Sequence, residues 1–297
     1  MLDFSNSKIL IVGDVMLDKY YFGKVDRISP EAPVPIVNIQ KEESRLGGAS
    51  NVANNIVSLG GHSLLCGVIG HDLFGKEIER ISRHKNIDTF LLKTSSPTIT
   101  KARIIGGKQQ IVRVDYEDKS ELNADNKKLF RDTISRILPE YDILVISDYG
   151  KGLISEDLCR YLIKLAHKYD KKVIIDPKGK NWEKYSGADI VTPNVKELSD
   201  IVGYTVPNTD RAIEKAAREA ITNNHLTALL VTRSDKGMSL IGPIPPIHIP
   251  THSEEVFDVS GAGDTVVATL GLCLAAGFEI SEAMRTANIA AGIVVKK

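Results

Sequence analysis

Short apolar runs alternate along this chain with longer segments whose apolar residues recur at helical spacing. The run Lys8–Asp14 is almost wholly apolar and ends in Gly-Asp, which is typical of a parallel strand buried on both faces. Similar runs predict strands at 63–69, 141–147, 172–176, 189–192 and 228–232, and helical periodicity predicts helices at 126–138, 155–168 and 209–223. This alternation predicts an α/β domain with a mainly parallel sheet and ligands at the carboxyl ends of its strands.

Two segments depart from this pattern. Residues 18–42 and 98–117 alternate apolar and polar residues and contain the turn signals Ser29-Pro30 and Gly106-Gly107. We expect hairpins that leave the main sheet and pair as a small β-sheet lid. The sequence contains no tandem repeat, low-complexity tract or linker, so we predict a single domain over 1–297 with this lid inserted.

Composition and charge narrow the function classes. The 297 residues are 42% hydrophobic and 26% charged, as in ordinary globular proteins, and 38 basic residues balance 38 acidic ones. With no basic run, neither nucleic acid nor an anionic membrane is an expected partner. Three widely spaced cysteines indicate neither a disulfide framework nor a zinc site. With no signal peptide and no 18-residue apolar run, we expect a cytoplasmic protein.

The segment Asp258–Asp264, with the sequence DVSGAGD, precedes an apolar helical stretch and is the strongest candidate for chemistry. Gly261, Ala262 and Gly263 place backbone N–H groups where a helix begins, and the positive end of the helix favours an anion such as phosphate. Asp264 in the same turn can take a proton from an attacking hydroxyl. A glycine-rich cap on a core helix is the alternative interpretation of this segment.

A second glycine site lies near the other end of the chain. Gly47 and Gly48 precede a helical pattern that has Asn51 in its first turn, so the backbone there can approach a sugar closely. With these two motifs in this order, the chain resembles the ribokinase, or PfkB, family of carbohydrate kinases over essentially its whole length. The resemblance implies a ribokinase-like three-layer α/β/α fold, a lid that closes over the sugar and often forms a homodimer contact, and phosphoryl transfer from ATP.

Further site residues follow strand ends. Asp14 can accept hydrogen bonds from sugar hydroxyls, and Lys178 in the Asp-Pro-Lys turn can neutralise a phosphate, although both also suit ordinary turns. Asn194 and Glu197 have the spacing of a helix N-terminus with an acidic first turn. The resemblance implies that this pair lies near ATP and Mg²⁺, with Glu197 reaching the metal through water, and it leaves a monovalent cation as a further candidate cofactor.

The resemblance also implies an ATP site in the last third of the chain. The turn from Thr232 to Gly237 is similar to the family's Thr-x-Gly-x-x-Gly nucleotide turn, with Ser234 in place of the first glycine. By the same resemblance, ATP-binding residues are Asn194, Glu197, Thr232, Lys236, Gly237, Ser260, Gly261, Gly263 and Asn288.

Residues of the predicted lid indicate which molecule accepts the phosphoryl group. Lys101 and Arg103 share one face of a strand and Arg113 lies on the returning strand, which suggests an acceptor that already bears a phosphate, or else a solvated charged edge. Segments 26–37, 100–115 and 147–152 resemble those of bacterial kinases that act on D-glycero-β-D-manno-heptose 7-phosphate, which implies that Asp148 also binds substrate. Those kinases are often fused to an adenylyltransferase. Another sugar or sugar phosphate, or a non-catalytic regulatory role, remains the alternative.

Overall fold

The computed structural model describes residues 2–119, 121–251 and 261–296. Its main sheet has nine strands in the order β13-β12-β11-β10-β9-β8-β1-β4-β5, with all neighbours parallel except that β12 pairs antiparallel with both β11 and β13. These strands are β1 (Lys8–Gly13), β4 (His62–Gly70), β5 (Asp88–Thr94), β8 (Ile143–Ser147), β9 (Lys172–Asp176), β10 (Ile190–Val191), β11 (Leu229–Thr232), β12 (Met238–Ile241) and β13 (Ile247–Ile249).

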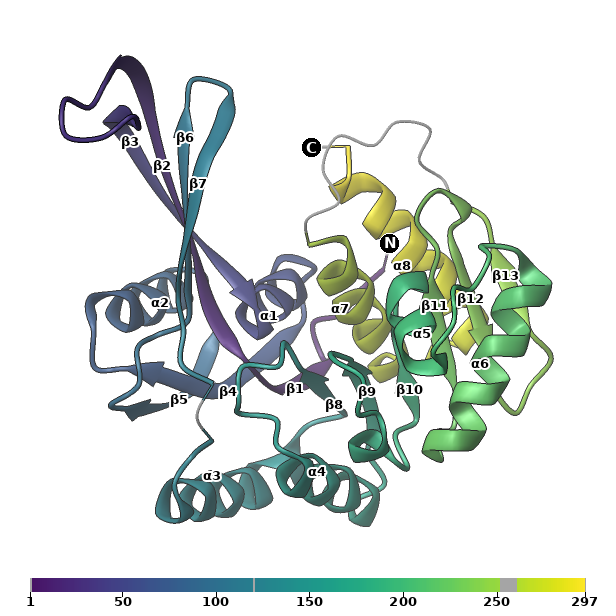
Figure 1. Ribbon diagram of the computed structural model, residues 1–297. Helices are drawn as coiled ribbons and strands as arrows, with labels where there is room; N and C mark the ends of the chain where they lie inside the picture. The colour runs from purple at the N-terminus through teal and green to yellow at the C-terminus, as the bar shows by residue number, and fades with distance from the viewer. Residues whose placement is uncertain (1, 120, 252–260, 297) are drawn as a thin grey trace.

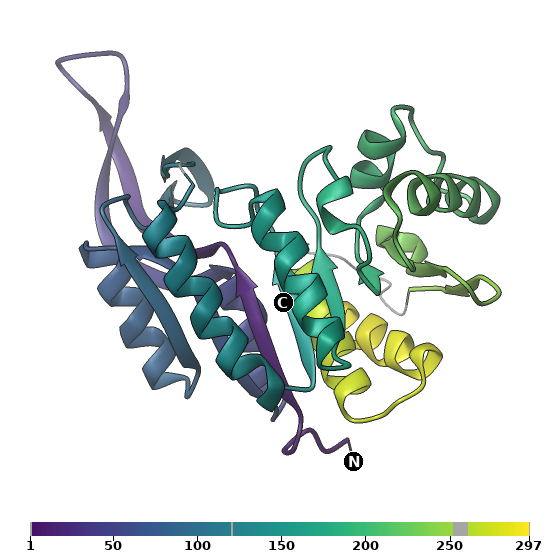
Figure 2. The ribbon, with the colours of Figure 1, turned by 90° about the horizontal axis from the view of Figure 1, so that it is seen from below.

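Helices cover both faces of this sheet, as Figures 1 and 2 show. One layer consists of α1 (Ala49–Ser58), α2 (Leu73–His84), α7 (Ala262–Ala275) and α8 (Ile280–Val294). The other consists of α3 (Ala124–Ile137), α4 (Glu156–Lys168), α5 (Val195–Val202) and α6 (Asp210–Asn224). The predicted three-layer α/β/α fold with a mainly parallel central sheet is therefore confirmed.

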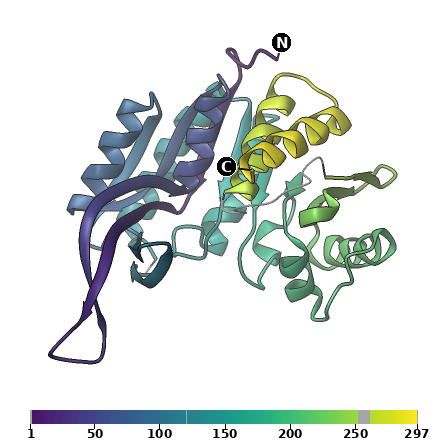
Figure 3. The ribbon, with the colours of Figure 1, turned by 90° about the horizontal axis from the view of Figure 1, so that it is seen from above.

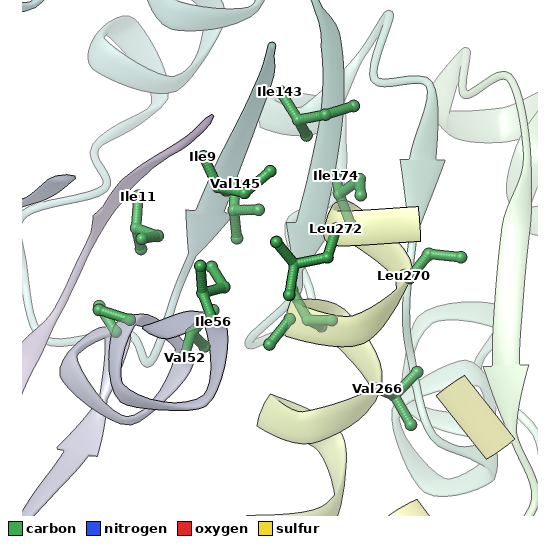
Figure 4. Packing of buried hydrophobic residues seen from close by; sticks show 14 of the residues in the cluster. Ile9, Ile11, Val52, Ile56, Ile143, Val145, Ile174, Val266, Leu270 and Leu272 are labelled. Atoms are coloured by element: carbon green, nitrogen blue, oxygen red, sulfur yellow. The ribbon is translucent and has the colours of Figure 1, made fainter. Parts of the chain in front are cut away.

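Successive side chains of β1 point to opposite faces of the sheet, and the core accordingly forms two clusters, one on each face. Ile9 and Ile11 pack with α1 and α7, whereas Leu10 and Val12 pack with α3 and α4 on the opposite face. Figure 4 shows the first cluster, in which Leu272 of α7 lies among side chains from α1 and from the central strands. Because both faces are buried, β1 has the continuous apolar run that the sequence shows.

A separate four-stranded sheet, the lid, rises from the edge of the main domain (Figures 1 and 3). Its order is β3-β2-β6-β7, formed by β2 (Val15–Ile28), β3 (Pro35–Gly48), β6 (Thr100–Gly106) and β7 (Gln109–Tyr116). The two predicted segments do pair as one sheet, although β2 begins at Val15 and β3 runs on to Gly48.

Several elements follow weaker sequence patterns and were not predicted. They include α2, β5 and the antiparallel edge strands β12 and β13, of which β13 spans three residues. The edge strand β5 is half-buried to exposed, so its apolar pattern is diluted. The strands β12 and β13 have only four and three residues, too few to show a clear periodicity. Within the described part of the chain, no helix is long and apolar enough to span a membrane.

Candidate active site

The candidate catalytic turn begins α7. Gly261 precedes the helix with a φ of 76°, a left-handed conformation that glycine adopts without strain, and Asp264 lies in the first helical turn. The Asp264 side chain is buried and both of its oxygens accept hydrogen bonds. Asn51 Nδ2 of α1 donates to Oδ2 at 2.6 Å, and the Tyr149 hydroxyl donates to Oδ1 at 2.9 Å. Three distant parts of the chain therefore meet at this carboxylate.

The environment of Asp264 suits a proton acceptor near neutral pH. Burial raises its pKa to about 6, although the hydrogen bonds from Asn51 and Tyr149 act in the opposite direction. A carboxylate with this pKa is largely ionised at pH 7 and binds a proton more readily than an ordinary aspartate does.

A cavity of about 560 Å³, here called the lid cavity, opens between the lid, α1 and Asp264. The predicted residues Gly47, Gly48, Asn51, Lys101, Arg103, Gly261 and Asp264 all line it. Gly48 is needed in its position, because a Cβ there would lie 2.6 Å from the Asp14 carbonyl oxygen and the φ is 55°. The tight entry into α1 therefore brings Asn51 to the cavity.

The lid cations differ in their pairing. Arg103 donates to Asp18 Oδ1 at 2.6 Å beside the cavity, whereas Lys101 lies over the Tyr149 ring, and burial lowers its pKa. Arg113 lies on the returning strand β7, directly opposite Arg103, so the two share a lid face, but Arg113 pairs with Asp115 and does not line the cavity.

Two further predicted substrate ligands lie outside the lid cavity, and their role in binding substrate stays a prediction. Asp14 does not line the lid cavity; its Oδ2 accepts backbone N–H groups of Tyr149 and Lys151, at 2.8 and 3.0 Å. Asp148 also lies outside that cavity, and its carboxylate accepts hydrogen bonds from Gly150 N, Lys184 and the Tyr185 hydroxyl. Both residues end buried strands, and both hold the backbone of the following loop in place.

A smaller cavity of about 170 Å³, the central cavity, adjoins Asp264 on its other side. Its lining includes Asp148, Asp176, Lys178, Glu197 and Gly263. Burial raises the pKa of Asp176 well above its ordinary value, and the Asp264 and Glu197 carboxylates add to the effect. This cavity therefore has more negative than positive groups around it.

Asn194 and Glu197 form a reciprocal capping box at the start of α5. Glu197 Oε1 also accepts from Lys178 Nζ at 3.0 Å, so the lysine predicted to bind phosphate is paired with the acid predicted to approach the metal. The structural and functional interpretations of this pair are compatible, because the cap places both side chains beside the central cavity.

A third cavity of about 480 Å³, the outer cavity, follows on from Gly263. It joins the predicted residues Asn194, Thr232, Gly237, Gly263 and Asn288. Lys236 instead donates to the Asn208 carbonyl oxygen, and Ser260 lies outside the described residues. Ser234, which replaces a glycine of the resembled motif, adopts the left-handed φ of 55°, so the turn forms despite the substitution.

The model of the pfkB family of carbohydrate kinases matches residues 6–297. The chain belongs to this family. Its members transfer a phosphoryl group to a sugar hydroxyl, and they use ATP with a divalent metal.

Curated relatives include the bifunctional protein HldE of Haemophilus influenzae strain PittEE, which is 46% identical over 99% of this chain. The HldE protein of Vibrio vulnificus strain YJ016 is 45% identical over the same share. The chain spans about three fifths of the length of these relatives, because the match covers 61% of each of them.

Solved structures of pfkB kinases share the fold at lower identity. Phosphofructokinase-2 of Escherichia coli in its tetrameric inhibited form has a TM-score of 0.81 at 21% identity, covering 98% of this chain and 94% of that one. Arabidopsis thaliana ribokinase with ribose and ATP has a TM-score of 0.75 at 20% identity, with 98% and 93% covered.

Sequence reasoning missed several residues of the lid cavity. Asp18, Arg45 and Lys85 line it, and Tyr149 separates it from the central cavity. Asp18 lies on β2, four residues after Asp14. Because alternate residues of a strand point to the same face, the alternation along 18–42 could have indicated that Asp18 faces the cavity. Lys85 follows α2, and its place beside the lid depends on tertiary packing alone.

Proposed function

We propose that this chain transfers the γ-phosphoryl group of ATP to the anomeric O1 hydroxyl of D-glycero-β-D-manno-heptose 7-phosphate. The product is the 1,7-bisphosphate, a precursor in ADP-heptose and lipopolysaccharide core synthesis. The observation that carries this proposal is the position of Asp264, which borders both the lid cavity and the central cavity. A carboxylate between an acceptor and a phosphate site has the geometry of a general base.

Residues of the three cavities bind different parts of the two substrates. Thr232, Gly237 and Asn288 bind the nucleotide in the outer cavity, which Gly263 connects to the central cavity. Backbone N–H groups at the start of α7 then stabilise charge on the phosphoryl group in transfer. Asp264 takes the proton of the acceptor hydroxyl from the side of the lid cavity.

The central cavity suits a divalent metal that binds together with ATP, and we propose Mg²⁺. Four carboxylates line this cavity, and the raised pKa of Asp176 reflects how little positive charge balances them. No three acidic, His or Cys side chains among the described residues converge to hold an ion directly. Glu197 and Asn194 would hold hydrated Mg²⁺ through water, and the metal would neutralise phosphate charge.

Cations in the lid cavity support a phosphorylated acceptor. Lys101 and Lys85 line the cavity, and the described residues supply no ion pair for either one. Arg103 and Arg45 also line it, but they already pair with Asp18 and Glu43. We therefore assign the 7-phosphate chiefly to Lys101 and Lys85, and sugar hydroxyls to Asp18 and Asn51.

Product analysis by ³¹P NMR tests the reaction. We expect an anomeric phosphate signal with heptose 7-phosphate and ATP, and little turnover with the unphosphorylated heptose, fructose, ribose or fructose 6-phosphate. Lys101→Ala should raise the KM for heptose 7-phosphate about 10-fold or more and leave the KM for ATP unchanged, because a charge-assisted hydrogen bond is lost. Lys93→Ala, with a surface lysine paired to Glu79, is the matched control. Preferred turnover of another acceptor would refute the assignment.

Assembly and context form the remaining part of the proposal. We infer a cytoplasmic homodimer that associates through the lid, because Val112 and Val114 are exposed on the lid face opposite Lys101 and Arg103. Light scattering of Val112→Asp tests this, and a wild-type monomer would refute it. The relatives are named bifunctional and are longer than this chain, so a second activity accompanies the kinase in them, and we propose that it is an adenylyltransferase.

A further inference from the structure

We propose that Tyr149 is a positioning residue for the reaction, whose hydroxyl holds the Asp264 carboxylate in the orientation that meets the acceptor. This inference rests on the proposed function, in which Asp264 is the base. Tyr149 follows β8 and borders both the lid cavity and the central cavity.

The hydrogen bonds at Asp264 define how the carboxylate lies. Asn51 donates to one oxygen and Tyr149 to the other, so neither oxygen can rotate away without losing a bond. Each oxygen keeps a further lone pair, and one of these remains for the acceptor proton. Burial raises the pKa of Tyr149, so its hydroxyl stays protonated and acts as the donor.

The loop that carries Tyr149 is itself anchored. Asp14 Oδ2 accepts the backbone N–H groups of Tyr149 and Lys151, and Asp148 Oδ1 accepts that of Gly150 at 2.8 Å. Asp14 is only 2% exposed, so these bonds form away from bulk water and restrain the loop strongly. Asp14 therefore contributes to the site by holding the loop that carries Tyr149.

Charged groups face Asp264 from both cavities that it borders. Besides the three described next, they are Arg45, Lys85 and Arg103 in the lid cavity and Asp148, Lys178 and Glu197 in the central cavity. Asp18 of β2 raises its pKa, Lys101 of β6 lowers it, and Asp176 of β9 lies across the central cavity. Against this background the Tyr149 hydroxyl stabilises the ionised form of the base. Removing the hydroxyl should therefore make Asp264 both less oriented and easier to protonate.

Tyr149→Phe tests the proposal with Tyr204→Phe as the matched control, since Tyr204 also donates to a carboxylate, Glu219, but is exposed. In Tyr149→Phe we expect kcat at pH 7 to fall about 10-fold, with the KM values for sugar and ATP within about twofold of wild type. The acidic limb of kcat/KM should move up by about one pH unit. Wild type and variant are measured with the same acceptor. Ionisation of the acceptor's phosphate then affects both pH profiles equally and does not contribute to the difference between them.

A double-mutant cycle separates this proposal from the proposed function. If Tyr149 acts through Asp264, adding Tyr149→Phe to Asp264→Asn lowers the residual rate no further. An unmoved acidic limb in a folded Tyr149→Phe enzyme, or full additivity in the cycle, overturns the positioning role. An Asp264→Asn enzyme with near-normal turnover instead overturns Asp264 as the base.

Asp14→Asn provides a second line of evidence on the loop. Because burial raises the pKa of Asp14 to about 6, this variant also removes a group that would titrate in the same range as Asp264. We expect a lower kcat with an unchanged KM for the sugar, since the loop is loosened but the lid cavity keeps its lining. A selective rise in the KM for the sugar would make Asp14 a sugar ligand and contradict its anchoring role.

Discussion

Gly263→Ala separates a phosphate site from an ordinary helix cap. Gly263 is the second residue of α7, and a Cβ built there meets no atom within 4 Å from other parts of the described chain. Its φ is not in the left-handed region, so alanine fits the backbone without strain. We therefore expect Gly263→Ala to stabilise the folded protein.

The expected gain follows from helix propensity. Replacing glycine by alanine in a compatible helical position stabilises a protein by about 0.4–1 kcal/mol, chiefly by restricting the unfolded chain. For a domain of this size that corresponds to a rise in Tm of about 1–4 °C. Gly271→Ala in the same helix is the matched control, because its Cβ would have ordinary contacts at 3.8 Å with Val145 and Ile174.

The expected loss follows from the direction of the new methyl group. A Cβ in the first helical turn points toward the N-terminus of the helix, where the central and outer cavities meet at Gly263. A phosphate displaced there by up to about 1 Å should lower kcat/KM by about 10- to 100-fold.

Coupled kinase assays and thermal melting on the same samples measure both effects. We expect Gly263→Ala to be at least as stable as wild type and much less active, and Gly271→Ala to be stable and fully active. Normal kcat/KM in Gly263→Ala would show that phosphate does not approach this turn, and the general-base assignment of Asp264 would lose its main support.

Three further predictions concern Asp264 and the turn from Thr232 to Gly237. Asp264→Asn should lower kcat by about 10²–10⁴-fold. It should also raise stability at pH 7 by on the order of 2 kcal/mol, because the native pKa of about 6 exceeds the ordinary 3.8; calorimetry should find the gain full above pH 6 and absent below about pH 4. Ser234→Val should lower the free energy of unfolding by about 1–2 kcal/mol in urea titrations, since the φ of 55° disfavours a β-branched residue, whereas Ser234→Gly should differ little from wild type. Gly237→Ala should cost about 2–4 kcal/mol and raise the KM for ATP, because its Cβ would lie 2.0 Å from the Ile249 carbonyl oxygen; a normal melting temperature would contradict this.

Local patterns in the sequence determined the fold class and the catalytic turn. Runs such as Lys8–Asp14 indicate buried parallel strands because both faces are covered, and this information is contained in a few adjacent residues. Likewise, the left-handed backbone of one turn requires Gly261, and Gly263 and Asp264 follow it in the same turn. Such features depend on neighbours along the chain, so they can be predicted without the rest of the molecule.

Only the tertiary structure decided which side chains meet the substrate cavities. Asp14 and Asp18 are four residues apart and both follow β1, yet the lid sheet brings Asp18 to the cavity while Asp14 anchors a loop that begins at Asp148. The hydroxyl of Tyr149 reaches Asp264 across 115 positions of sequence. These contacts depend on the packing of separate layers and on the course of loops, and no local periodicity encodes them.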